Sequence, residues 1–346
     1  MWGEWLLIEC VREEPTVMAI GRKPARLQPL QRALRGPALR VARRLTAQVR
    51  TGGHAWEETS RERGEHVIAE PIRNVAGQIH GVRIWTGALD TPVPAAPRSA
   101  AFDWNLKAAT VLLTEESYDM HAAAPEHRRP EITRMQAMRW LVHAADEGTA
   151  VALAAESDET TVHYDTWQIM RDDGIHRDIH FAARGAIVGG QRFIHGLMLD
   201  VSPGRDLPAP PPALTFDRAV MEAELSMPGL FHALVDLRTL TPHRWLGAAM
   251  PGIAWELGDD PDRVPALHPD DIPAARALAR GVLGGPVAGR LRLRNTQGGW
   301  TLVHVEAKRV LLTRDSDSVA ALVSVSHTTT PRQGLLPLVS EDTASS

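Results

Sequence analysis

Polar and apolar residues alternate most regularly between positions 160 and 201. Two runs with this period of two, Thr160–Arg171 and Ile175–Val188, flank the sequence Asp172-Asp173-Gly174. An Asp-Gly pair between two such runs is a strong signal for a tight β-hairpin. A third run, Arg192–Val201, follows the turn residues Gly189-Gly190. The pattern therefore predicts three successive antiparallel strands.

Apolar residues with helical spacing lie next to strand-like runs in two places. In Glu131–Val142 they recur every three or four residues, which predicts a helix that covers one side of the sheet. A second predicted helix, Ile272–Val282, precedes a hairpin of Ala288–Arg294 and Trp300–Leu312 and a last strand at Val319–Val325. The order of helix, hairpin and strand recurs, so we expect two units built on one plan.

The first 90 residues predict a small α+β unit. Strand-like runs at Trp5–Cys10 and Gln78–Trp85 enclose a region whose apolar residues, from Leu27 to Val49, have helical spacing. The polar face of this region is basic and contains no acidic residue, so it could be a solvated helix surface or a surface for nucleic acid. The apolar stripe favours the solvated helix, and we do not expect a nucleic-acid partner. The basic residues are Arg22, Lys23, Arg26, Arg32, Arg35, Arg40, Arg43, Arg44 and Arg50.

Two proline-rich stretches divide the chain. Thr91–Arg98 and Ser202–Pro212 interrupt all apolar periodicity and are typical of stiff linkers. They predict folded units at residues 1–90, 99–202 and 213–327. The remaining residues, 328–346, are rich in Thr and Ser and predict a disordered tail.

Composition indicates a folded cytoplasmic protein. Of the 346 residues, 44% are hydrophobic and 23% are charged, which is ordinary for a globular protein. No stretch is long and apolar enough to span a membrane, and acidic residues stand near the start, where a signal peptide needs positive charge. We therefore expect no membrane partner. The single cysteine, Cys10, excludes an internal disulfide or a thiolate metal cage and predicts a small buried apolar residue.

Short motifs in the second and third units resemble the PAS family. In the third unit they are Leu267–Asp271 (LHPDD), Gly289–Trp300 (GRLRLRNTQGGW) and Ala321–Ser326 (ALVSVS). In the second unit they are Leu141–Gly148 (LVHAADEG), Trp167–Phe181 (WQIMRDDGIHRDIHF) and His195–Ser202 (HGLMLDVS). The end of the first unit is instead similar to the late strands of a GAF-like domain.

This resemblance implies an α+β protein with tandem PAS-like domains, each a five-stranded antiparallel sheet with short helices on one face. Members of the family bind small ligands, associate with each other, or relay signals to an output module. The sequence contains no phosphate-binding glycine loop, serine-hydrolase elbow, zinc-protease motif or Cys-x-x-Cys pair, so we expect no enzyme. The expected function is a cytoplasmic sensory or regulatory protein that binds a small ligand and acts through self-association or a separate signalling partner. The alternatives are an interaction scaffold without a ligand, a metal-dependent enzyme that uses His176, Asp178 and His180, and a regulator that binds nucleic acid through its arginine-rich helix.

Candidate site residues follow from the same patterns. His176, Asp178 and His180 share one face of a predicted strand and could bind a divalent metal. We expect no metal there, because alternation assigns the three to the solvent side of the strand. The ligand remains unknown, and a covalent flavin is not expected because neither PAS-like unit contains a cysteine. Large apolar residues that could line a ligand pocket are Met135, Met138, Trp140, Trp167, Phe181, Trp255 and Trp300.

Overall fold

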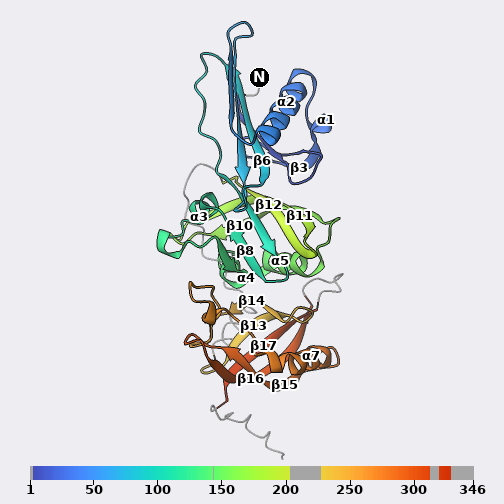
Figure 1. Cartoon of the computed structure of the whole chain (residues 1–346), viewed down its shortest axis with the longest axis vertical. Helices are drawn as coiled ribbons and strands as arrows, with labels where there is room; N and C mark the ends of the chain where they lie inside the picture. The colour runs from blue at the N-terminus through green and yellow to red at the C-terminus, as the bar shows by residue number, and fades with distance from the viewer. Residues whose placement is uncertain (1–2, 143, 203–226, 312–318, 329–346) are drawn as a thin grey trace, which may run out of the picture.

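Three antiparallel β-sheets follow one another along the long axis of the molecule (Figure 1). The computed structural model describes residues 3–142, 144–202, 227–311 and 319–328. Of the expected linker Ser202–Pro212, only Ser202 lies within the described residues, at the end of the middle unit. The expected tail, 328–346, also lies outside them beyond residue 328. No helix among the described residues is long and apolar enough to cross a membrane.

The N-terminal sheet has six strands in the order β3-β2-β1-β6-β5-β4. Helix α2 (Gly36–Gly52) packs across one of its faces through Leu45 and Val49, so the later part of the predicted apolar stripe is confirmed as the packing face of this helix. Its first residues, Leu27 and Leu30, precede the helix. Cys10 is buried, as predicted. The other elements are β1 (Trp5–Glu9), β2 (Thr16–Ile20), β3 (Lys23–Pro29), α1 (Leu30–Ala33), β4 (Trp56–Ser60), β5 (Glu65–Arg73) and β6 (Ile79–Ala88).

The middle sheet also has six strands, in the order β10-β11-β12-β7-β8-β9. The predicted hairpin is confirmed: the N–H of Gly174 donates to the Arg171 carbonyl over 2.9 Å, and Gly174 has a φ of 78°. Strands β7 (Ser99–Asn105), β8 (Thr110–Leu113) and β9 (Glu131–Thr133) complete the sheet beside β10 (Val162–Met170), β11 (His176–Val188) and β12 (Gln191–Asp200). The helices are α3 (Glu115–His121), α4 (Arg134–Met138) and α5 (Ala144–Glu156), with a short 3-10 turn, η1, at Pro125–His127.

The C-terminal sheet has five strands in the order β14-β13-β17-β16-β15. The predicted helix and hairpin of this unit are confirmed, with the turn at Asn295–Gly299. Its elements are β13 (Phe231–Asp236), β14 (Thr241–Leu246), η2 (Pro261–Arg263), η3 (Pro269–Asp271), α7 (Ile272–Gly281), β15 (Val287–Arg294), β16 (Trp300–Leu311) and β17 (Val319–His327).

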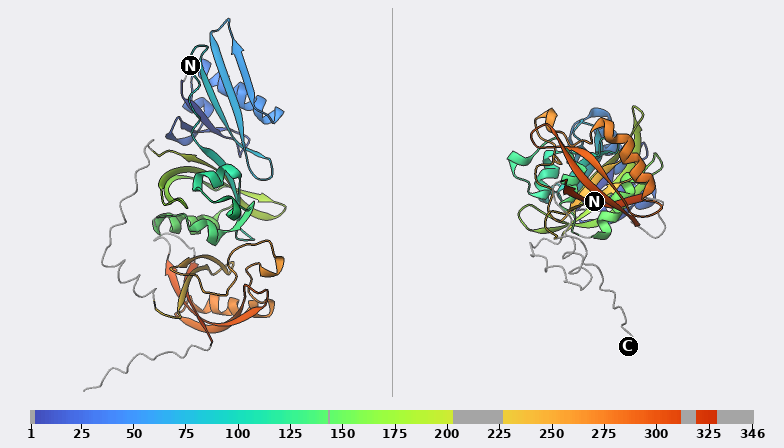
Figure 2. Two further views of the ribbon diagram at one scale, coloured as in Figure 1. Left: turned by 90° about the vertical axis from the view of Figure 1, so that its left-hand side faces the viewer. Right: turned by 90° about the horizontal axis from the view of Figure 1, so that it is seen from below.

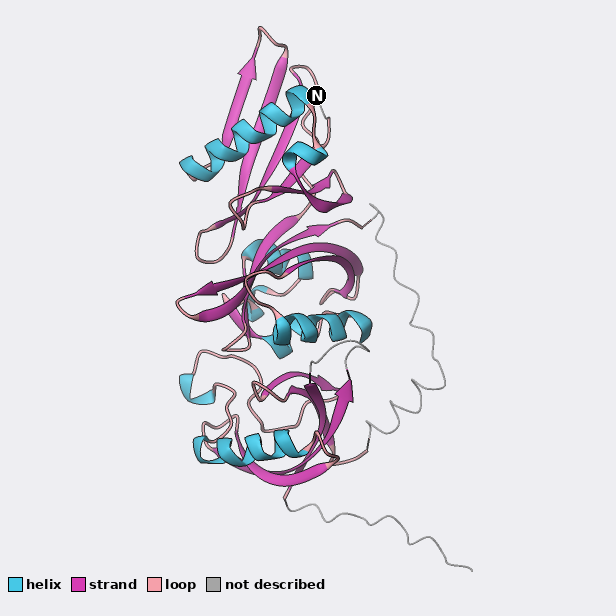
Figure 3. Cartoon of the chain, turned by 90° about the vertical axis from the view of Figure 1, so that its right-hand side faces the viewer, coloured by secondary structure: helices cyan, strands magenta, loops and turns pink. Residues whose placement is uncertain are grey.

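Sheets and helices form successive layers through the molecule (Figures 2 and 3). The N-terminal sheet packs face to face on the middle sheet, where Leu7 and Met18 meet Leu197 and Leu199. The opposite face of the middle sheet carries its own helices. Below them, Val151 of α5 packs on the outer face of the C-terminal sheet. Helix α7 covers the remaining face of that sheet.

The expected α+β arrangement of tandem PAS-like units is wrong. The N-terminal unit is a full six-stranded sheet, and the middle sheet has six strands and is covered on both faces. Several N-terminal strands show no alternation of polar and apolar residues, because both of their faces are buried. In β1, Leu6 and Ile8 pack in the core beneath α2 while Leu7 packs against the middle sheet.

Two predicted helices have different boundaries in the structure. The segment Glu131–Val142 begins as strand β9 and contains only the short helix α4. The Thr133 side chain accepts the Gln136 N–H and the Gln136 side chain accepts the Thr133 N–H, and this capping box starts the helix after the strand. The arginine-rich region likewise starts as strand β3, and its long helix begins only at Gly36.

Candidate functional site

A small apolar cavity of about 80 Å³ lies in the core of the middle unit. Four of the seven predicted pocket residues line it: Met138, Trp140, Trp167 and Phe181. The rings of Trp167 and Phe181 lie with their centroids 4.1 Å apart, on neighbouring strands β10 and β11. The cavity is large enough for a water molecule or a very small apolar molecule.

His121 is the polar side chain in the wall of this cavity. Its ring lies over Trp140, with centroids 4.0 Å apart. A carbonyl can only accept, so the Nδ1–H of His121 donates to the carbonyl of Ser117, 2.7 Å away. Burial lowers the pKa of His121 from 6.5 to about 4, because the charged ring would lose its hydration. The imidazole is therefore neutral at neutral pH.

A larger cavity of about 310 Å³ lies in the C-terminal unit, between the sheet and α7. Met135 and Trp255, two more of the predicted pocket residues, line it. Met135 comes from α4 of the middle unit, so the cavity reaches the boundary between the two units. Other lining residues from the sheet and the helix are Trp245, Leu278, Leu291, Leu293, Val305 and Val323, and Leu237 lines it from the turn after β13.

The seventh predicted pocket residue, Trp300, lines neither cavity. The guanidinium of Arg294 lies 3.9 Å from its ring centroid, and the ring of His268 lies 4.6 Å away. His268 in turn caps the turn η3, where its Nδ1 accepts the N–H of Asp270. Trp300 therefore packs against the guanidinium of Arg294 and the ring of His268 rather than in a pocket.

Buried polar groups border the larger cavity. Arg134 of α4 donates to the Thr241 hydroxyl over 3.0 Å, and Thr241 itself lines the cavity. Burial lowers the pKa of Arg134 to about 10. The indole Nε1 of Trp245 is buried and has no hydrogen-bond partner among the described residues. Sequence patterns missed Trp245 and Thr241, since the segment around β14 shows no clear periodicity.

The metal candidates on β11 make separate contacts in the structure. His176 Nδ1 lies 3.4 Å from Gln168 Oε1, and His180 Nδ1 lies 3.0 Å from Thr166 Oγ1. The N–H of Asp178 donates to the Ser202 hydroxyl. His180 is buried rather than solvent-facing, with 3% of its surface exposed. Among the described residues, side chains that could ligate a metal converge in a different place.

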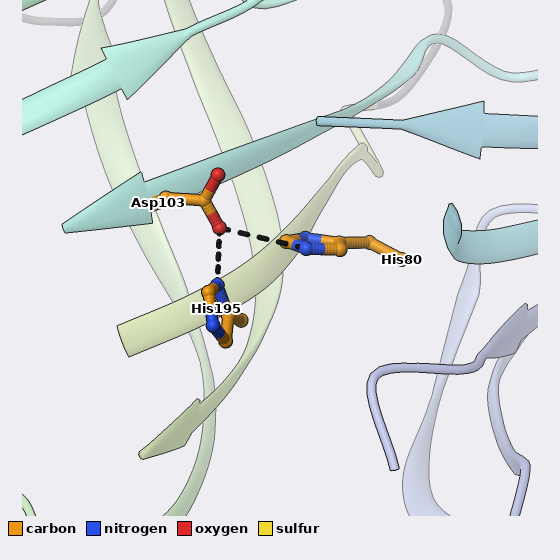
Figure 4. A group of neighbouring side chains, drawn as sticks. All are labelled: His80, Asp103 and His195. Carbon is orange, nitrogen blue, oxygen red and sulfur yellow. Dashed lines mark hydrogen bonds and ion pairs between the residues drawn. The ribbon is translucent and has the colours of Figure 1, made fainter. Parts of the chain in front are cut away.

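That convergence is formed by His80, Asp103 and His195 (Figure 4). Both imidazole rings approach the same carboxylate oxygen of Asp103. Burial is the main influence on the pKa of His80 and lowers it, although Asp103 acts in the opposite direction. The three residues are far apart in the sequence and lie on three strands, so no local motif reveals them.

Comparison with known proteins places the chain in a family. Residues 4–95 match the N-terminal domain model of the Rv3651-like family, and residues 216–333 match the model of its C-terminal domain. The crystal structure of an uncharacterized protein from Mycobacterium tuberculosis is similar in fold, with a TM-score of 0.78. That protein is 24% identical, and the match covers 94% of this chain and 97% of that one. No curated protein matches the chain.

The resemblance to PAS and GAF domains is wrong, because the family matches are to other domains. A sensory box histidine kinase/response regulator from Burkholderia thailandensis has 15% identity and a TM-score of only 0.26, over 37% of this chain and 86% of that one. An RNA-binding light-oxygen-voltage receptor has 8% identity and the same TM-score, over 67% and 96%. Likeness at that level supports no conclusion about the fold. The two domain models together span more than half of the chain, which therefore belongs to the Rv3651-like family.

Proposed function

We propose that the chain is a regulatory binding protein for a small, largely apolar molecule, held in the cavity between the C-terminal sheet and α7. The observation that carries this proposal is the cavity itself, with its volume of about 310 Å³ and its apolar walls. This volume falls at the lower end of the range for small-molecule sites.

The size of the cavity matters because protein interiors are close-packed. An empty apolar cavity of 310 Å³ would destabilise the folded state by several kcal/mol, at roughly 24 cal/mol for each Å³. A molecule that fills the cavity would restore the lost contacts. Binding only to the folded protein would also stabilise it by mass action.

The lining predicts the chemistry of the ligand. None of the described side chains that line the cavity carries a charge, so a charged group would lose hydration there without compensation. The unpartnered indole N–H of Trp245 can donate one hydrogen bond. The expected ligand is therefore neutral and mostly apolar, with one acceptor group such as a carbonyl, ether or hydroxyl oxygen.

The position of the cavity supports a regulatory role without catalysis. Met135 of the middle unit forms part of the wall, and the adjacent Arg134 bonds Thr241 across the same boundary. A change in occupancy would therefore alter contacts between the C-terminal and middle units. We propose that the cytoplasmic protein transmits this change by self-association or to a separate partner.

A cavity-filling variant tests the proposal. The probe is N-phenyl-1-naphthylamine, a neutral apolar dye whose fluorescence rises when it leaves water. We expect saturable binding to the full chain that Ala279→Phe abolishes, because Ala279 lines the cavity on α7. The matched control is Ala277→Phe, two residues earlier on the exposed side of the same helix, which should bind as the parent does.

Mass spectrometry of the natively purified protein gives an independent measurement. We expect a co-purified neutral molecule that is absent from the Ala279→Phe variant and present in Ala277→Phe. No saturable dye binding, or equal binding by both variants, would contradict the proposal. An interaction scaffold without a ligand would then be the better description.

A further inference from the structure

The boundary between the N-terminal and middle sheets brings three metal-ligating side chains together. Asp103 on β7 and His195 on β12 are directly opposite each other in the antiparallel pairing of the middle sheet. Cross-strand neighbours in this register project from the same face. His80, at the start of β6, reaches the pair from the N-terminal sheet.

Glycines allow the sheets and strands to approach closely around this cluster. A Cβ atom at Gly81, next to His80, would lie 2.6 Å from Leu197 Cδ1 in the middle sheet. A Cβ atom at Gly196, next to His195, would lie 2.8 Å from the carbonyl oxygen of Ala182. A larger residue at Gly196 would meet backbone and push its strand away from β11, whereas at Gly81 the Leu197 side chain would have to shift.

The potential ligand atoms lie at distances that one small cation can bridge. Asp103 Oδ1 lies 2.5 Å from His195 Nδ1 and 3.5 Å from His80 Nε2. All three atoms lie within 4.8 Å of one another. The other carboxylate oxygen, Oδ2, accepts a hydrogen bond from Asn74 Nδ2 over 2.8 Å. This bond holds Oδ1 toward the two rings (Figure 4).

The hydrogen bonding of His80 turns its other ring nitrogen toward Asp103. Its Nδ1 lies 3.2 Å from the carbonyl oxygen of Gly196, which can only accept, so Nδ1 carries a hydrogen. The Nε2 atom of the same ring faces Asp103 Oδ1 and is the atom placed to ligate a metal. Histidines that bind metals characteristically donate their other ring N–H to a backbone carbonyl or a carboxylate, as His80 does here.

We propose that His80, Asp103 and His195 bind a divalent transition metal of the Zn²⁺ type, which ties the N-terminal sheet to the middle sheet. Two imidazole nitrogens and one carboxylate oxygen suit Zn²⁺ and its first-row neighbours better than Mg²⁺ or Ca²⁺, which prefer oxygen ligands alone. Binding requires the contact between Asp103 and His195 to open so that an ion about 2.0–2.1 Å from each atom can enter. His195 retains 14% of its side-chain surface exposed, which leaves a route for the ion and for a water as fourth ligand.

Metal titration of the full chain, free of any purification tag and stripped with chelator, tests the inference. We expect calorimetry to show one Zn²⁺ per chain, and Co²⁺ to give the visible absorption bands of a tetrahedral site. His80→Ala and Asp103→Asn should each weaken binding at least about 100-fold, since loss of a supporting group alone costs about 10–100-fold. Asn74→Ala removes such a supporting group and should weaken Zn²⁺ binding about 10–100-fold.

His176→Ala is the matched control, because His176 belongs to the other candidate set on β11 and makes no contact with this cluster. It should leave the Zn²⁺ affinity unchanged. Far-ultraviolet circular dichroism identifies any variant that fails to fold, and the Co²⁺ spectrum of Asn74→Ala provides a readout in a chain that retains all three ligands. The inference is overturned if the parent binds no Zn²⁺ stoichiometrically, or if His80→Ala and Asp103→Asn bind as tightly as His176→Ala.

Discussion

His121 should make the stability of the protein depend on pH between about 6.5 and 4. The folded state lowers the pKa of this ring from 6.5 to about 4, mainly through burial. Asp172 favours the charged ring, whereas Arg139 and Arg171 oppose it. The unfolded chain takes up a proton at this ring near pH 6.5, and the folded chain only near pH 4. The contribution of the neutral ring to the free energy of unfolding is therefore fully present above pH 6.5. It is lost as the pH falls through this range.

The magnitude follows from the difference between the two pKa values. Each pKa difference of one corresponds to about 1.4 kcal/mol, so a change from 6.5 to about 4 corresponds to about 3 kcal/mol. His121→Phe keeps an aromatic ring beside Trp140 and cannot take up a proton. The free energy of unfolding of the parent should therefore fall by about 3 kcal/mol more than that of the variant between pH 7 and pH 4.

Urea unfolding at a series of pH values measures this difference directly. Other buried histidines titrate in both proteins, so the relevant quantity is the parent's free energy of unfolding minus that of the variant at each pH. His127→Ala, a change at an exposed histidine six residues away, is the control for loss of a histidine and should change the free energy of unfolding at pH 7 by no more than about 0.5 kcal/mol. If the difference between parent and His121→Phe stays constant from pH 7 to pH 4, the reasoning from burial is refuted.

Two further predictions concern stability. Arg184 Nη2 donates to Glu9 Oε2 over 2.7 Å between the N-terminal and middle sheets, so Glu9→Ala should cost about 3–5 kcal/mol in urea unfolding by leaving a buried guanidinium unpaired. The double variant Glu9→Met, Arg184→Met should regain much of the lost free energy of unfolding. If it is as unstable as Glu9→Ala, the unpaired guanidinium is not the cause. Gly174→Val should lower the free energy of unfolding by about 1–3 kcal/mol, because the turn holds Gly174 at a φ of 78°. An unchanged unfolding midpoint would contradict the assigned turn strain.

The features that the sequence predicted correctly depend on local chemistry. The hairpin at Asp173-Gly174 follows from the positive φ that glycine adopts without strain, whatever surrounds it. The helix Ile272–Gly281 likewise follows from its own apolar spacing. Four of the seven candidate pocket residues lie in the wall of one cavity, because large apolar residues of one unit converge in its core, and their role in binding a ligand stays a prediction.

The features that the sequence did not predict depend on which surfaces meet. Thr16–Ile20 is buried almost throughout, since the N-terminal sheet lies between α2 and the middle sheet, and alternation therefore could not identify this strand. The order of helix, hairpin and strand suggested PAS-like units. That order specifies neither how many strands each sheet contains nor which faces of the sheet are covered by other elements. His80 and His195 are 115 positions apart in the sequence, and only the packing of two sheets brings them to one carboxylate.

The middle unit is in a position to couple the two proposed sites. On one side, the Glu9–Arg184 pair and the His80 cluster join it to the N-terminal sheet. On the other side, Arg134 and Met135 join it to the wall of the C-terminal cavity. Buried polar contacts of this kind add little net stability, because desolvation offsets their attraction, but a misplaced partner would leave a charge or a hydrogen-bonding group unsatisfied. They therefore favour one relative placement of the sheets. A ligand in the C-terminal cavity would change this placement only by as much as its affinity differs between two positions of α4.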